Sequence, residues 1–352
     1  MTNRREFILG AGALAGCAIS NDGVSPSAEA SRFTPVTAGK TLKISATFLD
    51  EISDDIPHQN WGYDEWERDF LNMKAIGIDT VVMIRCAQRR FMAYPSKYLE
   101  SRGFYRPRVD LVEMFLTLAD KHGLKFYFGT ASDCRCYTAP GGVRRDPELD
   151  TNLFVTEEAW KAYGHHPSFR GWYLSNEISR RNEKHMNTFR KLGRHCKDLS
   201  GGLPVLMSPC IDGVKAIPVT VSSVHRKESI TVAQHEIEWN EIFDAIHESV
   251  DQCAFQDGHV DFNELPEFLA VNRKLTDKYG MQCWTNTETF DRDMPIKFLP
   301  IKFEKLLLKL DAASRCNYDK VITFEFSHFM SPQSVYLAAG NLYRRYREYF
   351  GI

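Results

Sequence analysis

Charge imbalance and long apolar runs are both missing from this sequence. Its 44 lysine and arginine residues nearly balance its 46 aspartate and glutamate residues, which gives a formal net charge of −2 at pH 7. Such a chain has no electrostatic field that would concentrate nucleic acid or an anionic membrane around it. No uninterrupted apolar run approaches the ~20 residues that a membrane-spanning helix needs. We therefore predict no nucleic-acid partner and no membrane span.

Close-spaced cysteine motifs are missing as well. The nine cysteines are scattered, and the closest pair, Cys134 and Cys136, encloses one residue, whereas the common zinc-binding and redox motifs enclose two. Cys86, Cys253 and Cys283 lie within apolar runs, where a thiol is usually a small buried hydrophobe. The sequence therefore predicts no metal site and no cofactor.

The N-terminus is typical of an export signal. A twin arginine, Arg4 and Arg5, is followed by Phe7 and by a short, mildly apolar, glycine-rich stretch over residues 10–19. This arrangement indicates a twin-arginine signal, because a helix of a folded domain would not contain so many glycines. We expect an exported protein that resides in the periplasm or at the cell surface.

The signal contains a candidate lipid-attachment site. Residues 14–17, Leu-Ala-Gly-Cys, resemble the lipobox of bacterial lipoproteins, in which the cysteine, here Cys17, is acylated and becomes the new N-terminus. Cleavage near residues 28–30 is the alternative and would leave no lipid anchor. We assign residues 1–30 to the signal and the start of a linker. Residues 31–40 complete this linker of small and polar residues, and residues 41–352 form one domain.

Short strand-like runs and longer helical segments alternate from Leu42 onward. The helical segments carry apolar residues on one face, for example Trp66, Phe70 and Met73, as expected for helices that pack on a sheet. This alternation predicts parallel βαβ units. The eight predicted strands are Lys43–Leu49, Thr80–Arg85, Lys125–Thr130, Gly171–Glu177, Pro204–Ser208, Gln252–Gln256, Gln282–Glu288 and Lys320–Ser327.

The lengths of the connections favour a closed barrel. Helix-to-strand connections are short, whereas strand-to-helix connections are long, notably residues 50–61, 86–108, 132–152 and 210–234. A doubly wound open sheet is the alternative, but no glycine-rich phosphate turn follows the first strand. We therefore predict an α/β fold, a single (β/α)8 TIM barrel, whose site lies at the C-terminal ends of the strands.

Two glutamates lie at the ends of predicted strands four and seven. If Glu177 points into the lumen, the alternation along its strand places Tyr173 there too and turns Trp172 toward the helices. Glu288 ends strand seven, and strands three steps apart in an eight-strand ring face each other across the mouth. Two such carboxylates can flank a glycosidic bond, one as general acid and one as nucleophile. Either glutamate alone could instead hold a loop, whereas the pair indicates a catalytic site.

These residues resemble a known group of enzymes. Asn176 and Glu177 at the end of strand four, together with Glu288, are similar to the motifs of the large clan of retaining β/α-barrel glycoside hydrolases. The resemblance implies that Glu177 is the acid/base, that Asn176 binds the sugar 2-hydroxyl and that Glu288 is the nucleophile.

The chain more closely resembles the bacterial family catalogued as domain of unknown function 4434, a glycosidase-like barrel. The resemblance spans nearly the whole mature chain, although each motif is short. It implies the fold better than the substrate, because the family brings no settled activity. The matching stretches are Thr47–Leu49, Gly171–Leu174 with Glu177, Phe255–Gly258, Thr287–Phe290, Phe324–Phe326 and Met330–Pro332.

The chain departs from the retaining clan in two strands. Strand six offers Gln256 and Asp257 where many clan members have a tyrosine that contacts the nucleophile. Residues 327–329, at the end of strand eight, stand where the clan usually has a sugar-stacking tryptophan. The mechanism is therefore less firmly implied than the fold.

Other polar residues at the strand ends are candidate substrate contacts. Arg85 either holds the strand-seven carboxylate in its ionised form or pairs with a loop. Glu325 falls on the side of strand eight that we expect to face the lumen, where it would bind a sugar hydroxyl or orient another side chain. Asp257 could equally cap a loop, and His328 could equally be structural. We predict that these four residues and Gln256 line one pocket with the two glutamates.

The leading hypothesis is an exported glycoside hydrolase that acts on an oligo- or polysaccharide through two glutamates, with a carbohydrate as its partner. One alternative is a metal-dependent sugar isomerase or lyase, in which Glu177, Asp257, Glu288 and Glu325 would bind Mg²⁺ or Mn²⁺. The other is a carbohydrate-binding lipoprotein that has lost the reaction. Barrels host many chemistries, so the fold alone does not choose among them.

Overall fold

The computed structural model describes residues 41–54, 56–132, 147–215, 229–293 and 298–352. The predicted export signal with Cys17, the linker and the Cys134–Cys136 pair lie outside the described residues. Among the residues that are described, no helix is both long and apolar enough to cross a membrane.

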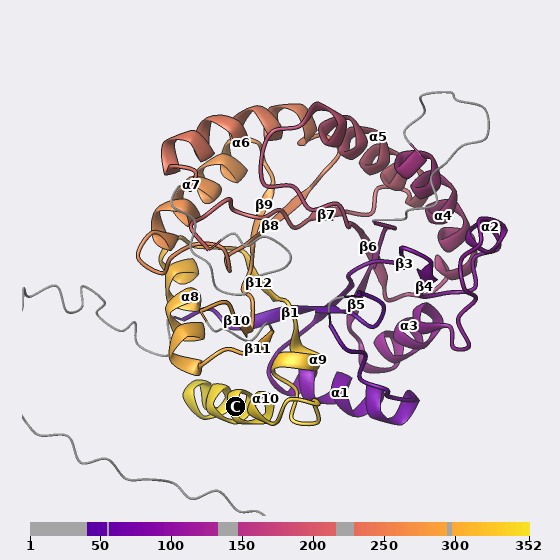
Figure 1. Ribbon diagram of the computed structural model, residues 1–352, viewed down its shortest axis with the longest axis horizontal. Coiled ribbons are helices and arrows are strands. Elements are labelled where there is room, and N and C mark those ends of the chain that lie inside the picture. Colours follow the sequence, from indigo (N-terminus) through magenta and orange to yellow (C-terminus); the bar gives the residue numbers. More distant parts are fainter. Residues whose placement is uncertain (1–40, 55, 133–146, 216–228, 294–297) are drawn as a thin grey trace, which may run out of the picture. The chain divides into compact units, whose positions relative to one another are not determined.

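Eight parallel strands in the described part of the chain close into a barrel (Figure 1). Each strand pairs with the next one in the ring, and the last pairs with the first. The predicted fold is therefore confirmed, and each predicted strand overlaps one strand of the barrel. The strands in ring order are β1 (Ile44–Leu49), β2 (Thr80–Met83), β5 (Lys125–Gly129), β6 (Phe169–Leu174), β7 (Val205–Met207), β8 (Gln252–Gln256), β9 (Gln282–Asn286) and β12 (Lys320–Thr323).

A helix of the outer ring follows each barrel strand, and smaller elements decorate three of the strand-to-helix connections (Figure 1). The ring consists of α1 (Tyr63–Ala75), α3 (Leu111–His122), α4 (Pro147–Tyr163), α5 (Glu183–Ser200), α6 (Val232–Ile246), α7 (Leu265–Lys278), α8 (Phe303–Arg315) and α10 (Leu337–Phe350). The smaller elements are β3 (Ala87–Gln88), β4 (Phe91–Met92), α2 (Lys97–Ser101), β10 (Phe290–Asp291), β11 (Leu299–Pro300) and α9 (Phe326–Phe329). The elaborated face is therefore the one at the C-terminal ends of the strands, as predicted.

Local sequence sets where several of these helices begin and end. The Asp110 side chain accepts a hydrogen bond from the Glu113 N–H at the start of α3, and Gly123, with φ at +70°, ends that helix in the left-handed conformation. Thr231 and Gln234 form a reciprocal capping box at the start of α6. Such caps satisfy backbone groups that have no partner inside the helix.

The barrel lumen is filled by one side chain or two from each strand. The buried lumen cluster contains Tyr173, whereas its neighbour Trp172 packs in the outer cluster between strands and helices, which confirms the predicted orientation of β6. A Cβ on Gly171 would lie 2.2 Å from the Tyr127 ring, so only glycine lets that ring fill the base of the lumen. The lumen cluster consists of Ala46, Phe48, Val82, Ile84, Tyr127, Tyr173, Leu206, Ala254, Trp284 and Ile322, with Phe324 packed against it.

The last strand differs from its prediction. It ends at Thr323, and the chain then turns into the short helix α9, whose N-cap is Glu325. Ile322 and Phe324 are the residues that face the lumen. Glu325 is therefore not in the lumen, and the prediction was wrong because it assigned the opposite side of this strand to the lumen.

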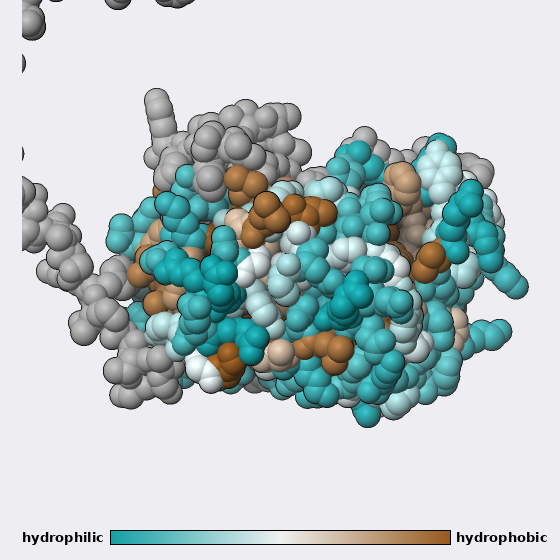
Figure 2. Space-filling model, turned by 90° about the horizontal axis from the view of Figure 1, so that it is seen from below, coloured by the Kyte–Doolittle hydropathy of each residue, from teal (hydrophilic) through white to brown (hydrophobic). Residues whose placement is uncertain are grey.

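The molecular face over α10 and α1 is mostly hydrophilic (Figure 2). Apolar side chains on this face form small separate patches. Leu337 at the start of α10 and Leu71 on α1 are among the exposed apolar residues. Isolated apolar residues of this kind are normal on a protein surface.

Candidate active site

One cavity lies at the C-terminal ends of the barrel strands and has a volume of about 260 Å³. Both predicted catalytic glutamates line it, so the fold brings together residues that are 111 positions apart in the sequence. Its lining consists of Asp50, Asp54, Ile84, Arg85, Gln88, Tyr173, Glu177, Gln256, Asn286, Glu288, Phe290, Arg292, Phe298 and Phe324.

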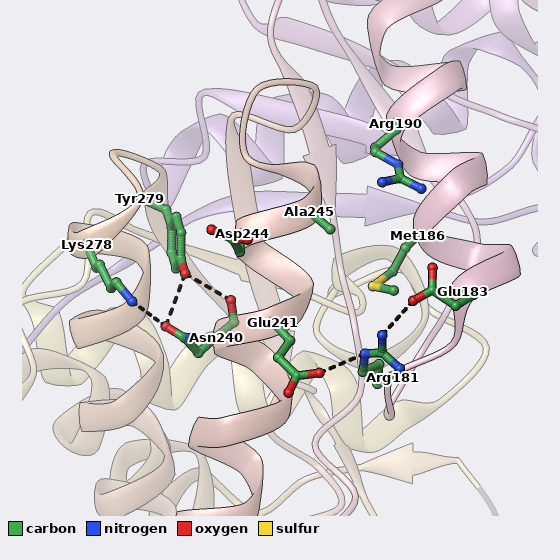
Figure 3. Close-up of a pocket in the computed structure, with 10 residues that line it drawn as sticks. All are labelled: Arg181, Glu183, Met186, Arg190, Asn240, Glu241, Asp244, Ala245, Lys278 and Tyr279. Atoms are coloured by element: carbon green, nitrogen blue, oxygen red, sulfur yellow. Dashed lines mark hydrogen bonds and ion pairs between the residues drawn. The ribbon is translucent and has the colours of Figure 1, made fainter.

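A larger groove, of about 470 Å³, lies in the helical layer beside α5, α6 and the end of α7 (Figure 3). Several of its polar side chains contact one another. Arg181 contacts Glu241 at 2.8 Å and Glu183 at 2.5 Å, and the Tyr279 hydroxyl donates to the Asn240 backbone carbonyl at 3.0 Å. Most of the residues drawn in Figure 3 are on the outer helices α5, α6 and α7, while Arg181 precedes α5 and Tyr279 follows α7. Position and composition, rather than size, therefore mark the smaller cavity as the candidate active site.

Glu288 is held as an ionised carboxylate. Its side chain is 2% exposed and accepts two hydrogen bonds from Arg292, with Nε and Nη2 each 2.6 Å from one carboxylate oxygen. Burial alone would raise the pKa of Glu288, but the charge and hydrogen bonds of Arg292 outweigh burial and lower it. An ionised carboxylate is the form that a nucleophile or a general base requires.

A buried ion pair holds the backbone of Glu288 in place. Asp257 and Lys309 lie 2.7 Å apart and are both almost fully buried. The Asp257 carboxylate accepts the Glu288 N–H at 3.1 Å, and the Lys309 ammonium donates to the Glu288 carbonyl at 3.0 Å. Burial raises the pKa of Asp257, and the Lys309 charge opposes that shift. The Asp257–Lys309 pair therefore positions Glu288 and does not line the cavity, which corrects the prediction that Asp257 does.

Gly258 leaves space for the Glu288 carboxylate. A Cβ at this position would lie 1.6 Å from Glu288 Oε2 and 2.5 Å from Arg292 Nε. No side chain fits there unless the carboxylate and its guanidinium partner move.

We expect Gly258→Ala to lower activity on any cleaved glycoside by about 10²-fold, because a displacement of about 1 Å at a reacting group can cost that much. The measurement is kcat/KM together with the melting temperature. Gly340→Ala on α10 is the matched control, since its Cβ would meet its nearest neighbour at 3.5 Å, an ordinary contact. Full activity in Gly258→Ala would show that the carboxylate position does not matter to the reaction.

Glu177 follows β6 and lines the cavity with an exposed side chain. Its charge, after burial, contributes to the raised pKa of Tyr173, which lies in the lumen. The charges of Glu177 and Glu288 both act to raise the pKa of Cys210 and of Arg292. The two carboxylates therefore belong to one electrostatic environment.

Three further predicted contacts differ in their placement. Arg85 lines the cavity and donates to the Ser132 hydroxyl at 3.1 Å, while the group that clamps the strand-seven carboxylate is Arg292. Gln256 also lines the cavity. The Asn176 amide nitrogen donates to Glu148 on α4 at 2.6 Å, and Asn176 is not part of the lining.

Glu325 and His328 form a buried pair that does not line the cavity. The Glu325 carboxylate accepts the backbone N–H groups of Ser327 and His328, and it contacts His328 Nδ1 at 2.5 Å. His328 Nε2 contacts the Pro57 carbonyl. Burial would lower the pKa of His328, but Glu325 and this carbonyl raise it to about 9. The two residues anchor α9, so the prediction that they line the pocket is corrected.

Two functional residues, Arg292 and Lys309, were not predicted from the sequence. Arg292 follows Glu288 by four positions, but the intervening chain is a strand and a bend, so helical spacing could not have found it. Lys309 lies on the apolar stripe of α8, beside the buried Leu306 and Leu310. A lysine within a buried stripe needs a carboxylate partner, and that signal was available.

Three of the four carboxylates that the alternative metal site would require pair with basic side chains. Asp257 pairs with Lys309, Glu288 with Arg292, and Glu325 with His328. Within the described ranges, no group of three histidine, cysteine, aspartate or glutamate side chains converges as metal ligands do. The donor set therefore does not fit the metal-dependent isomerase or lyase that the sequence left open.

Comparison with known proteins identifies similar chains. A family model described as "Domain of unknown function (DUF4434)" matches residues 44–336. A crystal structure described as that of a "putative alpha-L-fucosidase" from Bacteroides thetaiotaomicron VPI-5482 is 59% identical, with a TM-score of 0.85, and the match covers 92% of this chain and 99% of that one. No curated protein matches the chain.

Other solved structures share the fold at low identity. The endo-1,4-β-D-mannanase of Thermotoga petrophila RKU-1 is 12% identical, with a TM-score of 0.53, and the match covers 81% of this chain and 88% of that one. The β-galactosidase of Marinomonas ef1 is 11% identical, with a TM-score of 0.51 and coverage of 82% and 55%. These structures support the barrel architecture.

Proposed function

We propose that this chain, which belongs to the family described as domain of unknown function 4434, is an exported glycoside hydrolase. The observation that carries the proposal is the cavity at the strand ends, in which Glu177 and the ionised Glu288 line one space. A glycosidic bond needs one group to protonate the leaving oxygen and another to stabilise or attack the anomeric carbon. The close similarity to a protein described as a fucosidase agrees with this reaction class.

In the proposed mechanism, Glu288 is the nucleophile and Glu177 the general acid/base. Arg292 keeps Glu288 ionised, so its carboxylate can attack the anomeric carbon. Glu177 gives its proton to the glycosidic oxygen, and the leaving group departs as an alcohol. Glu177 then takes a proton from a water molecule, whose oxygen displaces Glu288 from the sugar. Because attack and displacement each invert the anomeric centre, the product retains the configuration of the substrate.

The stereochemical outcome tests this version of the mechanism. Direct attack requires carboxyl groups ~5–5.5 Å apart, whereas inversion through an interposed water needs ~6.5–9.5 Å. Proton NMR of the first product formed distinguishes the two, since the retained anomer appears before mutarotation. An inverted first product would rule out Glu288 as a nucleophile while leaving the hydrolase assignment in place.

The substrate is a carbohydrate, and terminal α-L-fucosides are the first candidates because of the description of the 59% identical structure. The cavity volume of about 260 Å³ lies just below the ~300–1,000 Å³ typical of pockets for small organic ligands. That space suits one sugar residue. The first experiment is therefore a panel of aryl glycosides, with the α-L-fucoside included, assayed with the purified mature chain.

On a glycoside from this panel, we expect Glu177→Ala to keep part of its turnover when the leaving group is a good one, because such a group departs without protonation. Added azide should restore the rate, since it replaces the water that Glu177 would activate, and a glycosyl azide should form. Glu267→Ala, an exposed change on α7, is the control and should behave as the parent. Full activity of Glu177→Ala on substrates with poor leaving groups would remove Glu177 from the mechanism.

Export rests on the twin arginine and the lipobox-like sequence, which lie outside the described residues. We expect replacement of Arg4 and Arg5 by lysine to leave precursor in the cytoplasm, because the twin arginine is the recognised feature. Cell fractionation measures this, and mass spectrometry of the mature N-terminus tests lipidation of Cys17. An unmodified N-terminus near Ser31 would exclude the anchor but not the export.

A further inference from the structure

Asp50 lines the cavity and has one buried carboxylate oxygen that lacks a partner in the described part of the chain. The residue directly follows β1, lines the cavity and is 1% exposed. Its Oδ1 accepts the backbone N–H groups of Ser53 at 3.0 Å and Ile52 at 3.3 Å, which fixes the orientation of the carboxylate. Its Oδ2 is buried and has no hydrogen-bond partner among the described residues. A buried acceptor without a partner is costly, so a ligand that brings a donor gains at this position.

Asn286 places a second acceptor at the same cavity. It ends β9, two residues before Glu288, and is 3% exposed. The Ser208 hydroxyl donates to the Ala254 carbonyl at 2.8 Å, so its lone pairs are left to accept the Asn286 Nδ2 group at 3.0 Å. This network fixes the direction of the amide. Asn286 Oδ1 is therefore the free end, and it too has no partner among the described residues.

The charges of the lining leave the Asp50 acceptor to decide between ligands. Of the four carboxylates in the lining, Glu177 carries a proton in the proposed mechanism, Glu288 pairs with Arg292 and Asp54 pairs with Arg89. A ligand carboxylate would bring only acceptors to Asp50 Oδ2 and Asn286 Oδ1 and would be repelled by the Asp50 carboxylate. A hydroxyl group brings a donor and no charge.

Three aromatic side chains also line the cavity. Phe290, Phe298 and Phe324 all line the cavity, and the Phe290 ring lies 4.7 Å from that of Phe298 and 6.2 Å from that of Phe324. Aromatic faces of this kind pack against C–H groups. The cavity therefore suits a molecule that has both hydroxyl donors and C–H groups.

We propose that Asp50 and Asn286 form a specificity subsite that accepts hydrogen bonds from hydroxyl groups of an uncharged sugar and rejects sugars that carry a carboxylate. The proposal rests on the proposed function, because it concerns the sugar bound beside Glu177 and Glu288. It names the substrate class as neutral terminal glycosides, which excludes uronides.

The test compares matched neutral and acidic sugars. Calorimetric titration measures binding of fucose, galactose and glucose against galacturonic and glucuronic acid, and kcat/KM is measured on the corresponding aryl glycosides. The parent should prefer a neutral sugar to its uronic acid by at least about 10²-fold, as a site built to pair with a substrate hydroxyl discriminates strongly. Asp50→Asn keeps the Oδ1 acceptor but replaces Oδ2 by a donor, and it should reduce this preference at least tenfold.

Glu51→Gln is the matched control. Glu51 is the next residue in the chain, its carboxylate accepts the Gln59 N–H at 3.0 Å, and it does not line the cavity. The preference of Glu51→Gln for a neutral sugar over its uronic acid should stay within about threefold of the preference of the parent. The melting temperature of each variant establishes that it is folded.

Equal binding of a neutral sugar and its uronic acid by the parent, or an unchanged preference in Asp50→Asn, would overturn the subsite. If the protein binds a neutral sugar more tightly than its uronic acid but cleaves no glycoside, the subsite stands and the proposed hydrolase activity is rejected. A parent that neither binds nor cleaves any sugar of the panel would overturn both.

Discussion

Glu288→Gln is expected to lower kcat on a cleaved glycoside by a factor on the order of 10⁴, because an amide can neither attack the anomeric carbon nor carry negative charge opposite it. The change is isosteric, so the shape of the cavity is kept. KM should change much less than kcat, because the lost interaction forms in the transition state. Full activity of this variant on a verified substrate would reject the proposed mechanism.

The same substitution also tests the Arg292 clamp. With glutamine at 288, the Arg292 guanidinium loses the carboxylate that neutralises it, and breaking a buried pair costs on the order of 3 kcal/mol. We therefore expect a lower melting temperature as well as lower activity. The double variant Glu288→Gln, Arg292→Gln removes both charges and should recover much of the stability while the activity stays lost. This pattern would separate the chemical role of Glu288 from its structural one.

Lys309→Met is expected to have the largest effect on stability, a loss of about 3–5 kcal/mol, because it leaves the Asp257 carboxylate buried without its partner. Methionine fills a similar volume, so lost packing contributes little. Denaturant unfolding followed by circular dichroism measures the loss. Activity should fall too, since Lys309 and Asp257 hold the Glu288 backbone from both sides.

Two variants control for this change. Lys302→Met, at the exposed N-cap of the same helix, should alter the free energy of unfolding by less than about 0.5 kcal/mol. The double variant Lys309→Met, Asp257→Asn removes both buried charges and should be more stable than Lys309→Met alone. If Lys309→Met is as stable as the parent, the buried ion pair between Lys309 and Asp257 does not contribute to the free energy of unfolding as predicted.

The sequence was a reliable guide to the barrel because the relevant signal is local. Residues such as Trp66, Phe70 and Met73 repeat at helical spacing, and all three are buried in α1. The orientation of Tyr173 and Trp172 also followed from the alternation within one strand. The prediction for Glu325 was wrong, because Ile322 and Phe324 are the residues of this segment that face the lumen. Alternation groups the residues of a strand by side, but it does not by itself say which side faces the lumen.

The candidate site was only partly visible in the sequence. Glu177, Glu288, Arg85 and Gln256 were expected at the strand ends, and all four line the cavity. Asp257 was expected there too, but its carboxylate points to Lys309 instead. The Asp257 carboxylate bonds to Lys309 because α8 packs next to it. The spacing of residues along the chain does not show which helix packs next to a given strand end.

The number of βα units, their order and the face on which the polar residues gather all follow from periodicity and connection length, so they can be predicted from the sequence. Which of those polar residues meet depends on the folded barrel. Arg292 clamps Glu288, Gly258 leaves it space, and Asp50 presents an oxygen to the same cavity from the end of β1. These contacts join β1, β8 and β9, and their geometry is set by the closure of the barrel and the packing of α8 against it. Electrostatic and hydrogen-bond energies depend on distances of a few ångströms between such distant segments, which a linear pattern does not contain.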